Sequence, residues 1–185
     1  MAKQSDNNAT HGIRGKVNLF VYRQRYGETI ASKVPVRTAA FSETQLGIQA
    51  TFKMAVLYAK AILQNPAIRQ AYQAKAKRGQ TAFNRAVADF FKIPVISDVD
   101  LTQLTNQAGS SILAMVTDDF RVESVKVKIE KANGAFLEEG NAVPEQDGLH
   151  WKYTVTSTGA NGPGNKVTIT ATDLPGHSIV EQKTI

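Results

Sequence analysis

The chain has 185 residues, of which 42% are hydrophobic and 21% charged, and none is cysteine. This composition is typical of a folded globular protein, and the lack of cysteine excludes disulfides, thiolate metal sites and cysteine nucleophiles. The net charge of +6 is uneven: residues 1–94 carry 15 basic and four acidic side chains, whereas residues 95–185 carry seven and twelve. A basic half joined to an acidic half predicts either an anionic partner or head-to-tail contact between copies.

The N-terminal residues, MAKQSDNNAT, are polar and lack an apolar core, so they predict no classical secretory signal. The longest apolar run is only a few residues, so we expect no membrane insertion. The protein is therefore expected to be cytoplasmic, or part of a particle released without such a signal. Residues 1–15 predict a polar arm in front of the folded domains.

Residues 16–36 alternate apolar and polar side chains and predict a β-hairpin with its turn near Gly27. A single strand over residues 17–22 would place its odd-numbered apolar residues on one face and Phe20 and Tyr22 on the other. Both faces of this strand are then partly apolar. Because an isolated hairpin is marginal in water, this one is expected to pack on another element.

Three helices are predicted between residues 42 and 94. Ser42 caps the first helix, and Gln45 completes its capping box. Asn65-Pro66 starts the second helix, and Thr81 caps the third. Apolar residues at helical spacing from residue 52 to residue 63 predict a buried stripe on the first helix. Hairpin and helices together predict one domain over residues 16–94.

From residue 95 onward the hydrophobic pattern changes to period two. Apolar residues alternate with polar ones around Ile112, Val127, Tyr153 and Ile169, and clusters of turn-forming residues separate these runs. About seven short strands in some ninety residues are typical of an antiparallel sandwich. The predicted fold class is therefore α+β, with the N-terminal hairpin and three-helix unit followed by a β-sandwich domain over residues 95–185.

The stretches VTDDFRVESVKVKI, GLHWKYTVT and VTITATDLPGHSIVEQKTI resemble bacterial immunoglobulin-like modules, which are found in many surface and particle proteins. Such modules often place an alanine-x-aspartate-x-x-glycine turn before the last strand, and Ala171, Asp173 and Gly176 are close to that pattern. His177 stands where asparagine is common. The resemblance covers residues 95–185 and implies an immunoglobulin-like sandwich without catalytic residues.

The N-terminal stretches GIRGKVNLFVYRQRYGETIASKVP and SETQLGIQATFKMAVLYAKAIL are similar to short uncharacterised proteins of Bacteroidota-type bacteria. Those proteins open with a Gly-Lys-Val hairpin and continue into helices. This resemblance implies an architecture and brings no function with it.

Enzymatic activity, cofactors and metal sites are not predicted. His11, His150 and His177 have no ligand spacing, and the glycine-rich stretch TGANGPGNK lacks the spacing of a phosphate loop. No nucleophile elbow occurs. We interpret the glycine-rich stretch as a flexible connection between two strands.

Three aspartates lie in predicted turns of the sandwich: Asp118, Asp119 and Asp173. If they met at one end of the sandwich, their carboxylate oxygens would suit calcium. Aspartate is also common in turns because its side chain accepts hydrogen bonds from nearby backbone N–H groups. The second interpretation is favoured.

The basic half of the chain suggests nucleic acid as an alternative partner. In the hairpin, Arg23 and Arg25 alternate with Tyr22 and Tyr26, which would combine phosphate neutralisation with stacking surfaces. The helices would add further phosphate contacts from Lys75, Lys77, Arg78 and Arg85. The pattern matches no established nucleic-acid-binding motif, and basic residues near helix ends also complement the helix dipole.

Self-assembly is the favoured hypothesis, because unpaired strand edges invite pairing with another chain and a head-to-tail contact generates rings or filaments. The predicted function is that of a structural subunit of a filament, tube or phage-like particle, whose partners are other copies of the chain. The docking strand is predicted to comprise Val17, Leu19, Phe20, Val21 and Tyr22, with Arg23, Arg25 and Lys33 as its charged flank. The predicted acceptors on the sandwich are Glu123, Glu130, Glu138 and Glu139.

Overall fold

The computed structural model describes residues 2–4, 12–36 and 39–185, and the chain forms two compact units that divide between Thr51 and Phe52. The sequence places a domain boundary after residue 94, whereas the structure groups the helical region from residue 52 onward with the strands that follow it. The helix α1, Glu43–Ile62, contains the division. Each unit is described by itself below.

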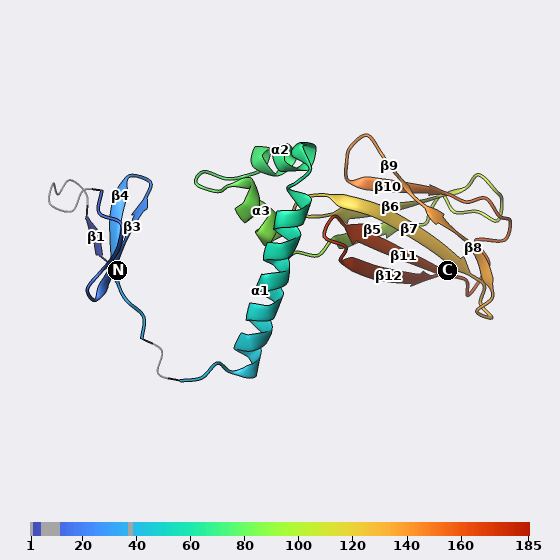
Figure 1. Ribbon diagram of the computed structural model, residues 1–185. Coiled ribbons are helices and arrows are strands. Elements are labelled where there is room, and N and C mark those ends of the chain that lie inside the picture. The colour runs from blue at the N-terminus through green and yellow to red at the C-terminus, as the bar shows by residue number, and fades with distance from the viewer. Residues whose placement is uncertain (1, 5–11, 37–38) are drawn as a thin grey trace. The chain divides into compact units, whose positions relative to one another are not determined.

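The first unit contains a four-stranded antiparallel sheet in the order β1-β4-β3-β2 (Figure 1). Its strands are β1 (Ala2–Gln4), β2 (Gly15–Val17), β3 (Phe20–Arg25) and β4 (Glu28–Lys33). The predicted turn near Gly27 is confirmed. Tyr26 and Gly27 have φ angles of 54° and 85°, as the type I′ turn that joins β3 to β4 requires at both central positions.

The prediction of one strand over residues 17–22 is wrong. A turn at Asn18 and Leu19 separates β2 from β3, and Asn18 has a φ of 52°. Asparagine tolerates this left-handed conformation better than most residues. Val17 therefore pairs with Phe20 and lies on the same face of the sheet.

The predicted polar arm is partly a strand, because Ala2–Gln4 pairs with β4 and Gly15 begins β2. Residues 1 and 5–11 of that arm, including His11, lie outside the described residues.

The three predicted helix starts are confirmed. The helices are α1 (Glu43–Ile62), α2 (Pro66–Ala74) and α3 (Ala82–Asp89). Ser42 N–H donates to Gln45 Oε1 and Gln45 N–H donates to Ser42 Oγ, which completes the capping box. Asn65 Oδ1 accepts from the first turn of α2, and Thr81 Oγ1 accepts from the first turn of α3.

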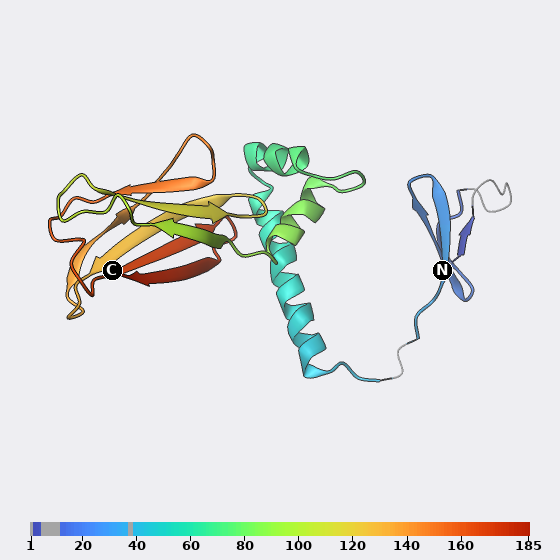
Figure 2. The same cartoon turned by 180° about the vertical axis from the view of Figure 1, so that it is seen from behind.

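Two four-stranded antiparallel sheets pack on each other in the second unit, and together they are called the paired sheets (Figures 1 and 2). The strand orders are β5-β6-β10-β9 and β12-β11-β7-β8. Alternate residues of β6, β7 and β11 are buried in one shared core, as the period-two pattern predicts. The strands are β5 (Val95–Asp100), β6 (Ser111–Thr117), β7 (Val122–Glu130), β8 (Phe136–Asn141), β9 (Val143–Pro144), β10 (His150–Thr154), β11 (Lys166–Asp173) and β12 (Ser178–Thr184).

The glycine-rich connection before β11 is held by hydrogen bonds, in contrast to the flexible connection that the sequence predicts. Asn165 is buried, and its side-chain amide donates to the carbonyl oxygens of Gly159 and Ala160. The Asn165 amide oxygen also accepts from Ala132 N–H. These bonds fix the connection to the end of the paired sheets.

The helices and the paired sheets form one unit because Phe120, in the β6–β7 connection, enters the helical core. Its ring stacks on Tyr72 of α2 with centroids 3.7 Å apart, and Phe120 is only 6% exposed. Lys75 Nζ donates to the Phe120 carbonyl oxygen, and Arg85 of α3 forms an ion pair with Asp119 at 2.8 Å. The remaining buried members of this core are Ala59, Leu63, Tyr72, Ala82 and Ala86.

Replacing Phe120 with alanine should reduce the free energy of unfolding by about 3–5 kcal/mol, because it removes a buried ring and leaves a cavity against Tyr72. Chemical denaturation followed by circular dichroism measures the change. Phe136→Ala is the matched control, since Phe136 is 62% exposed and should cost less than about 0.5 kcal/mol. Equal losses in the two variants would contradict the assignment of Phe120 to the helical core.

Candidate interaction surfaces

The N-terminal sheet has one basic face. The strand register places Lys16 of β2 opposite Val21, and places Arg23 opposite Ile30, so these four side chains share a face with Arg25. Lys16, Arg23 and Arg25 are exposed, whereas the two apolar residues are only partly so. Glu28 pairs with Arg25 in the register and lies on the same face, so this face groups three cations and one carboxylate over a partly apolar surface.

The opposite face of the sheet carries apolar and aromatic side chains next to the hydrogen-bonded pair of Gln24 and Thr29. Val17, Phe20, Tyr22 and Ala31 lie on it, together with Lys33 at its edge. Val17 is 52% exposed and Phe20 is 41% exposed, so this face is incompletely covered. Of the predicted docking residues, Val17, Phe20 and Tyr22 are thus brought together here.

The remaining predicted docking residues lie elsewhere: Leu19 is in the turn, and Val21 points to the basic face. This register also bears on the predicted stacking platform. Tyr22 is on the face opposite Arg23 and Arg25, so the alternation of cations and rings along the sequence does not form one surface. Tyr26 lies in the turn, where the Arg25 guanidinium is 5.3 Å from its ring centroid. In this cation–π contact, the Arg25 guanidinium and the Tyr26 ring bind each other.

Helix α1 carries apolar side chains on two opposite sides. The inner stripe is the one predicted from the apolar residues between positions 52 and 63. Three of its members, Ala55, Ala59 and Leu63, are buried. Phe52 was predicted to be buried with them but is 52% exposed, with its ring stacked on Phe91 at 6.4 Å. Phe91 is itself 47% exposed, so the inner stripe is covered only toward its C-terminal end.

The outer stripe of α1 is defined as Leu46, Ala50, Met54, Leu57 and Ala61. Their spacings of three and four residues place them on one side of the helix, and all five are exposed. Leu46, Met54 and Leu57 are between 52% and 65% exposed. The sequence prediction concentrated on the inner stripe and missed this one, although the same periodicity reveals it.

The four glutamates predicted as acceptors are already engaged by their own domain. Glu123 pairs with Arg121 at 2.7 Å, Glu130 with Lys128 at 2.8 Å and Glu139 with Lys126 at 3.0 Å. These pairs lie on the exposed surface, where each contributes at most about 1 kcal/mol. Solvent-exposed partners of this kind can be exchanged for the charges of another molecule.

The prediction of Glu138 as a surface acceptor is wrong, because Glu138 is only 6% exposed. Its carboxylate accepts from Thr156 N–H, Thr156 Oγ1 and Ser157 N–H. Burial alone would raise the pKa of Glu138, but these hydrogen bonds outweigh it and lower the pKa. Glu138 therefore holds β8 to the end of β10.

Two of the predicted helical phosphate contacts are also used inside the protein. Lys75 donates to the Phe120 carbonyl oxygen and lies 4.9 Å from the Phe120 ring centroid. Arg85 donates to the backbone oxygen of Asp119 and pairs with its carboxylate. Both side chains join the helices to the paired sheets.

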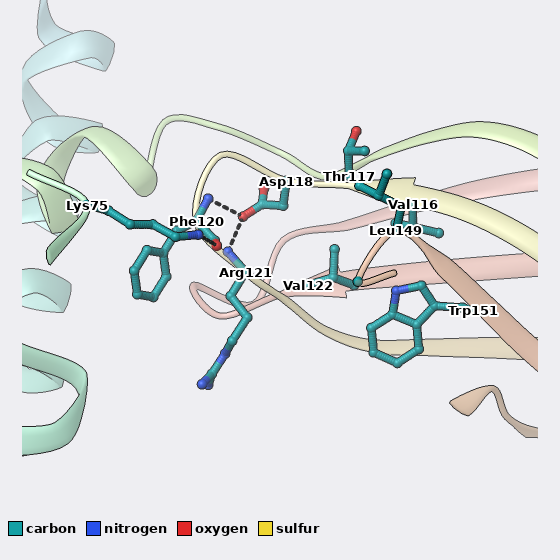
Figure 3. Close-up of a pocket in the computed structure, with 10 residues that line it drawn as sticks. Lys75, Val116, Thr117, Asp118, Phe120, Arg121, Val122, Leu149 and Trp151 are labelled. Atoms are coloured by element: carbon teal, nitrogen blue, oxygen red, sulfur yellow. Dashed lines mark hydrogen bonds between the residues drawn. The ribbon is translucent and has the colours of Figure 1, made fainter. Parts of the chain in front are cut away.

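A pocket of about 310 Å³ lies where α2 meets the paired sheets (Figure 3). In Figure 3, Lys75 reaches toward Phe120 on one side of the pocket, and Trp151 lies on the other side. Asp118 Oδ2 accepts from Phe120 N–H and Arg121 N–H, both at 2.9 Å, and so shapes the loop that forms the floor. Lys75 and Arg121, the two cations at this pocket, both have partners in this chain.

A buried hydrogen-bond network joins the three helices. Tyr72 of α2 donates to Asp89 Oδ2 of α3 at 2.7 Å, and Tyr58 of α1 lies 3.0 Å from the Tyr72 hydroxyl. Burial, together with the neighbouring Asp118, Asp173 and Asp119, raises the pKa of Asp89 to about 6. The bond from Tyr72 opposes this rise.

Burial also raises the pKa of Tyr58 to about 12 and raises that of Tyr72. Asp89 Oδ1 is buried and has no hydrogen-bond partner among the described residues. The ionised form of Asp89 is thus costly in the folded protein.

The aspartates considered for calcium act in turns. Asp118 caps the β6–β7 connection, Asp119 pairs with Arg85, and Asp173 Oδ1 accepts from His177 N–H at 2.6 Å. In the described parts of the chain, no three histidine or carboxylate side chains gather as a metal site would require. His177 Nδ1 lies 3.0 Å from Asp173 Oδ2, and His150 Nδ1 contacts Asp147 Oδ2. His150 and His177, the histidines within the described residues, thus each have a carboxylate neighbour three or four residues away.

Comparisons with known proteins do not assign this chain to a family. No protein-family model matches the chain, and no curated protein matches it. Among solved structures, the crystal structure of an engineered protein is similar, with 16% identity and a TM-score of 0.35. The match covers 56% of this chain and 25% of that one, and at this TM-score it carries no argument.

Within the described residues, no single helix has both the length and the apolar character needed to cross a membrane. Only α1 and α2 taken together pass that test of length and composition, and they are bent by 117°.

Asp89→Asn should change the pH dependence of stability. Because the folded protein raises the pKa of Asp89, protonation stabilises the fold most below about pH 4, and this stabilisation is lost as the pH rises through about 6. The stability of Asp89→Asn relative to the parent should therefore increase by roughly 3 kcal/mol between pH 3 and pH 8. Denaturant unfolding at several pH values measures this difference.

Glu138→Gln is the matched control of opposite sign. The pKa of Glu138 is lowered, so its carboxylate contributes stability above its ordinary pKa and loses it in acid. This variant should become less stable relative to the parent as the pH rises from 3 to 7. Parallel pH profiles for the two variants would contradict both assignments.

Proposed function

We propose that the protein is a structural subunit that assembles with copies of itself into a filament, tube or phage-like particle. The observation that carries this proposal is the apolar surface of α1, a 20-residue helix with exposed leucine, isoleucine, phenylalanine and methionine on more than one side. A helix with apolar stripes on opposite sides normally has both of them covered. Covering one of these half-exposed large side chains contributes roughly 1 kcal/mol to an assembly, about half of the value for full burial.

The N-terminal sheet supports the same proposal. Its apolar face carries Val17 and Phe20 with substantial exposure, and a sheet of this size gains stability when such a face packs on another element. The basic face of the sheet, with Lys16, Arg23 and Arg25, complements the acidic balance of residues 95–185. A contact between the sheet of one copy and the acidic half of the next would be heterologous, and such contacts extend into rings or filaments.

We also propose that the paired sheets are an immunoglobulin-like sandwich, as the sequence resemblance implies. Strand orders of β5-β6-β10-β9 and β12-β11-β7-β8 correspond to the ABED and GFC arrangement of that fold, with β8 as an added edge strand. The immunoglobulin disulfide and its packed tryptophan on the third strand have no counterpart here, since the chain lacks cysteine and its tryptophan is on β10. In the assembly, this domain would be the rigid body that presents α1.

Leu57→Glu should weaken assembly at least tenfold, about 1.4 kcal/mol, because it places a charge on the outer stripe of α1. Light scattering over a concentration series, with negative-stain electron microscopy of the same samples, measures the effect. Phe136→Glu is the matched control, since Phe136 is similarly exposed but lies on β8. A parent protein that stays monomeric at about 20 kDa at every concentration would overturn the proposal.

Nucleic-acid binding is a second proposal, favoured by the shared face of Lys16, Arg23 and Arg25. If this face contacts phosphates, the double variant Arg23→Glu/Arg25→Glu should reduce the slope of log affinity against log salt by about 2. Fluorescence anisotropy with a labelled single-stranded oligonucleotide measures the slope. The same variant should weaken particles instead if the face binds the acidic half of another copy. An unchanged oligonucleotide slope together with unchanged particles would remove the basic face from both roles.

A further inference from the structure

We propose that α1 pairs with α1 of a second copy, antiparallel and about a two-fold axis, through the outer stripe. This inference rests on the proposed function and names one contact of the assembly. The stripe covers nearly the whole helix, which is about 30 Å long. Its five members are exposed, so a second helix can reach all of them.

The order of large and small side chains along the outer stripe is self-complementary when one helix is reversed. In an antiparallel pair centred between residues 53 and 54, Leu46 of one copy lies opposite Ala61 of the other. In the same register, Leu57 lies opposite Ala50. Each large side chain then faces a small one and fits the space beside it, as knobs fit holes in helix pairs.

Met54 lies beside the axis of this pair and meets its own symmetry mate. Its unbranched side chain adapts to such a contact. A parallel pair in register would instead set Leu46 against Leu46 and Ala50 against Ala50. Crowded and empty layers would then alternate, which forfeits packing contacts in the empty layers.

The charges on α1 favour the antiparallel arrangement. Glu43 is the acidic residue of the first turn and Lys60 is the basic residue of the last. The antiparallel register brings Lys60 of the second copy within about one turn, roughly 6 Å along the axis, of Glu43. It also sets the two helix dipoles in opposite directions, which is the favourable arrangement. A parallel pair would bring like charges together at both ends.

Lys53 provides a test of the register, because it lies at the edge of the stripe beside the two-fold axis. In the proposed pair it faces its own symmetry mate, so the two ammonium groups repel each other. Lys53→Ala should therefore tighten the dimer several-fold, with the largest effect at low salt. A weaker dimer for this variant would overturn the register.

The chain has no cysteine, so single-cysteine variants report on the contact without interference. Met54→Cys should form a disulfide-linked dimer when oxidised with copper phenanthroline, since its two copies meet at the axis. Leu46→Cys alone should not, because its two copies are roughly 22 Å apart along the helices, far beyond the reach of a disulfide. Mixing Leu46→Cys with Ala61→Cys should give the cross-linked pair. All three positions are exposed, so each variant should fold, and circular dichroism tests this.

The outcomes separate this inference from the proposed function. Efficient cross-linking of Leu46→Cys alone would indicate a parallel pair and overturn the inference while assembly stands. Assemblies seen by light scattering without any cross-link among the three variants would have the same consequence. A protein that is monomeric at all concentrations would overturn both proposals. Monomers that sediment with phosphatidylcholine vesicles would also overturn both proposals. They would show that the outer stripe binds a lipid surface.

Discussion

The insertion of Phe120 into the helical core is the contact on which the second unit depends. It stacks on Tyr72 at the point where α2 would otherwise expose its largest ring, and Lys75 and Arg85 bind the backbone on either side of it. The three helices alone bury few large side chains, and most of the buried residues around Tyr72 are alanines. The β6–β7 connection supplies the missing ring. Helices and paired sheets therefore share one core and are expected to unfold together.

This anchoring leaves α1 in an unusual position. The second unit covers the C-terminal part of its inner stripe through Ala55, Ala59 and Leu63, whereas Phe52 remains half exposed and the outer stripe is open along its length. The helix propensity of a 20-residue segment is insufficient to explain so many exposed apolar side chains. A partner that covers them is the physical requirement from which the proposed assembly follows, and the self-complementary order of the outer stripe points to a second copy.

Local chemistry was predictable from the sequence, and long-range burial was not. The caps at Ser42, Asn65 and Thr81 depend on neighbouring residues only, and so do the alternating strands and the turn at Tyr26-Gly27. The turn at Asn18 contains no glycine and lies among residues that alternate with period two, so the sequence did not indicate it.

The burial of Phe120, which the sequence does not indicate, and the wrong prediction of Glu138 as a surface acceptor have the same origin. Phe120 follows two aspartates in a turn-like cluster, and nothing in that cluster indicates a core residue. Glu138 is buried because Thr156 and Ser157, about eighteen residues away, donate to its carboxylate. In the candidate surface, the additional turn at Asn18 changes which docking residues share a face, because it moves Val17 to the side of Phe20 and Tyr22 and away from Val21.

The buried polar network explains how α1 selects one of its two apolar sides. Hydrophobic spacing alone does not decide between the inner and outer stripes, because both repeat with helical period. The inner stripe has alanines where α1 approaches its own domain, which permits close packing. Tyr58 lies between the two stripes and is hydrogen-bonded to Tyr72, which in turn donates to Asp89. A rotation of α1 by one residue, about 100°, would break the bond between Tyr58 and Tyr72, whereas the bond from Tyr72 to Asp89 joins α2 to α3 and would remain. The Tyr58–Tyr72 bond therefore favours the orientation of α1 that holds the inner stripe against the domain and leaves the outer stripe exposed.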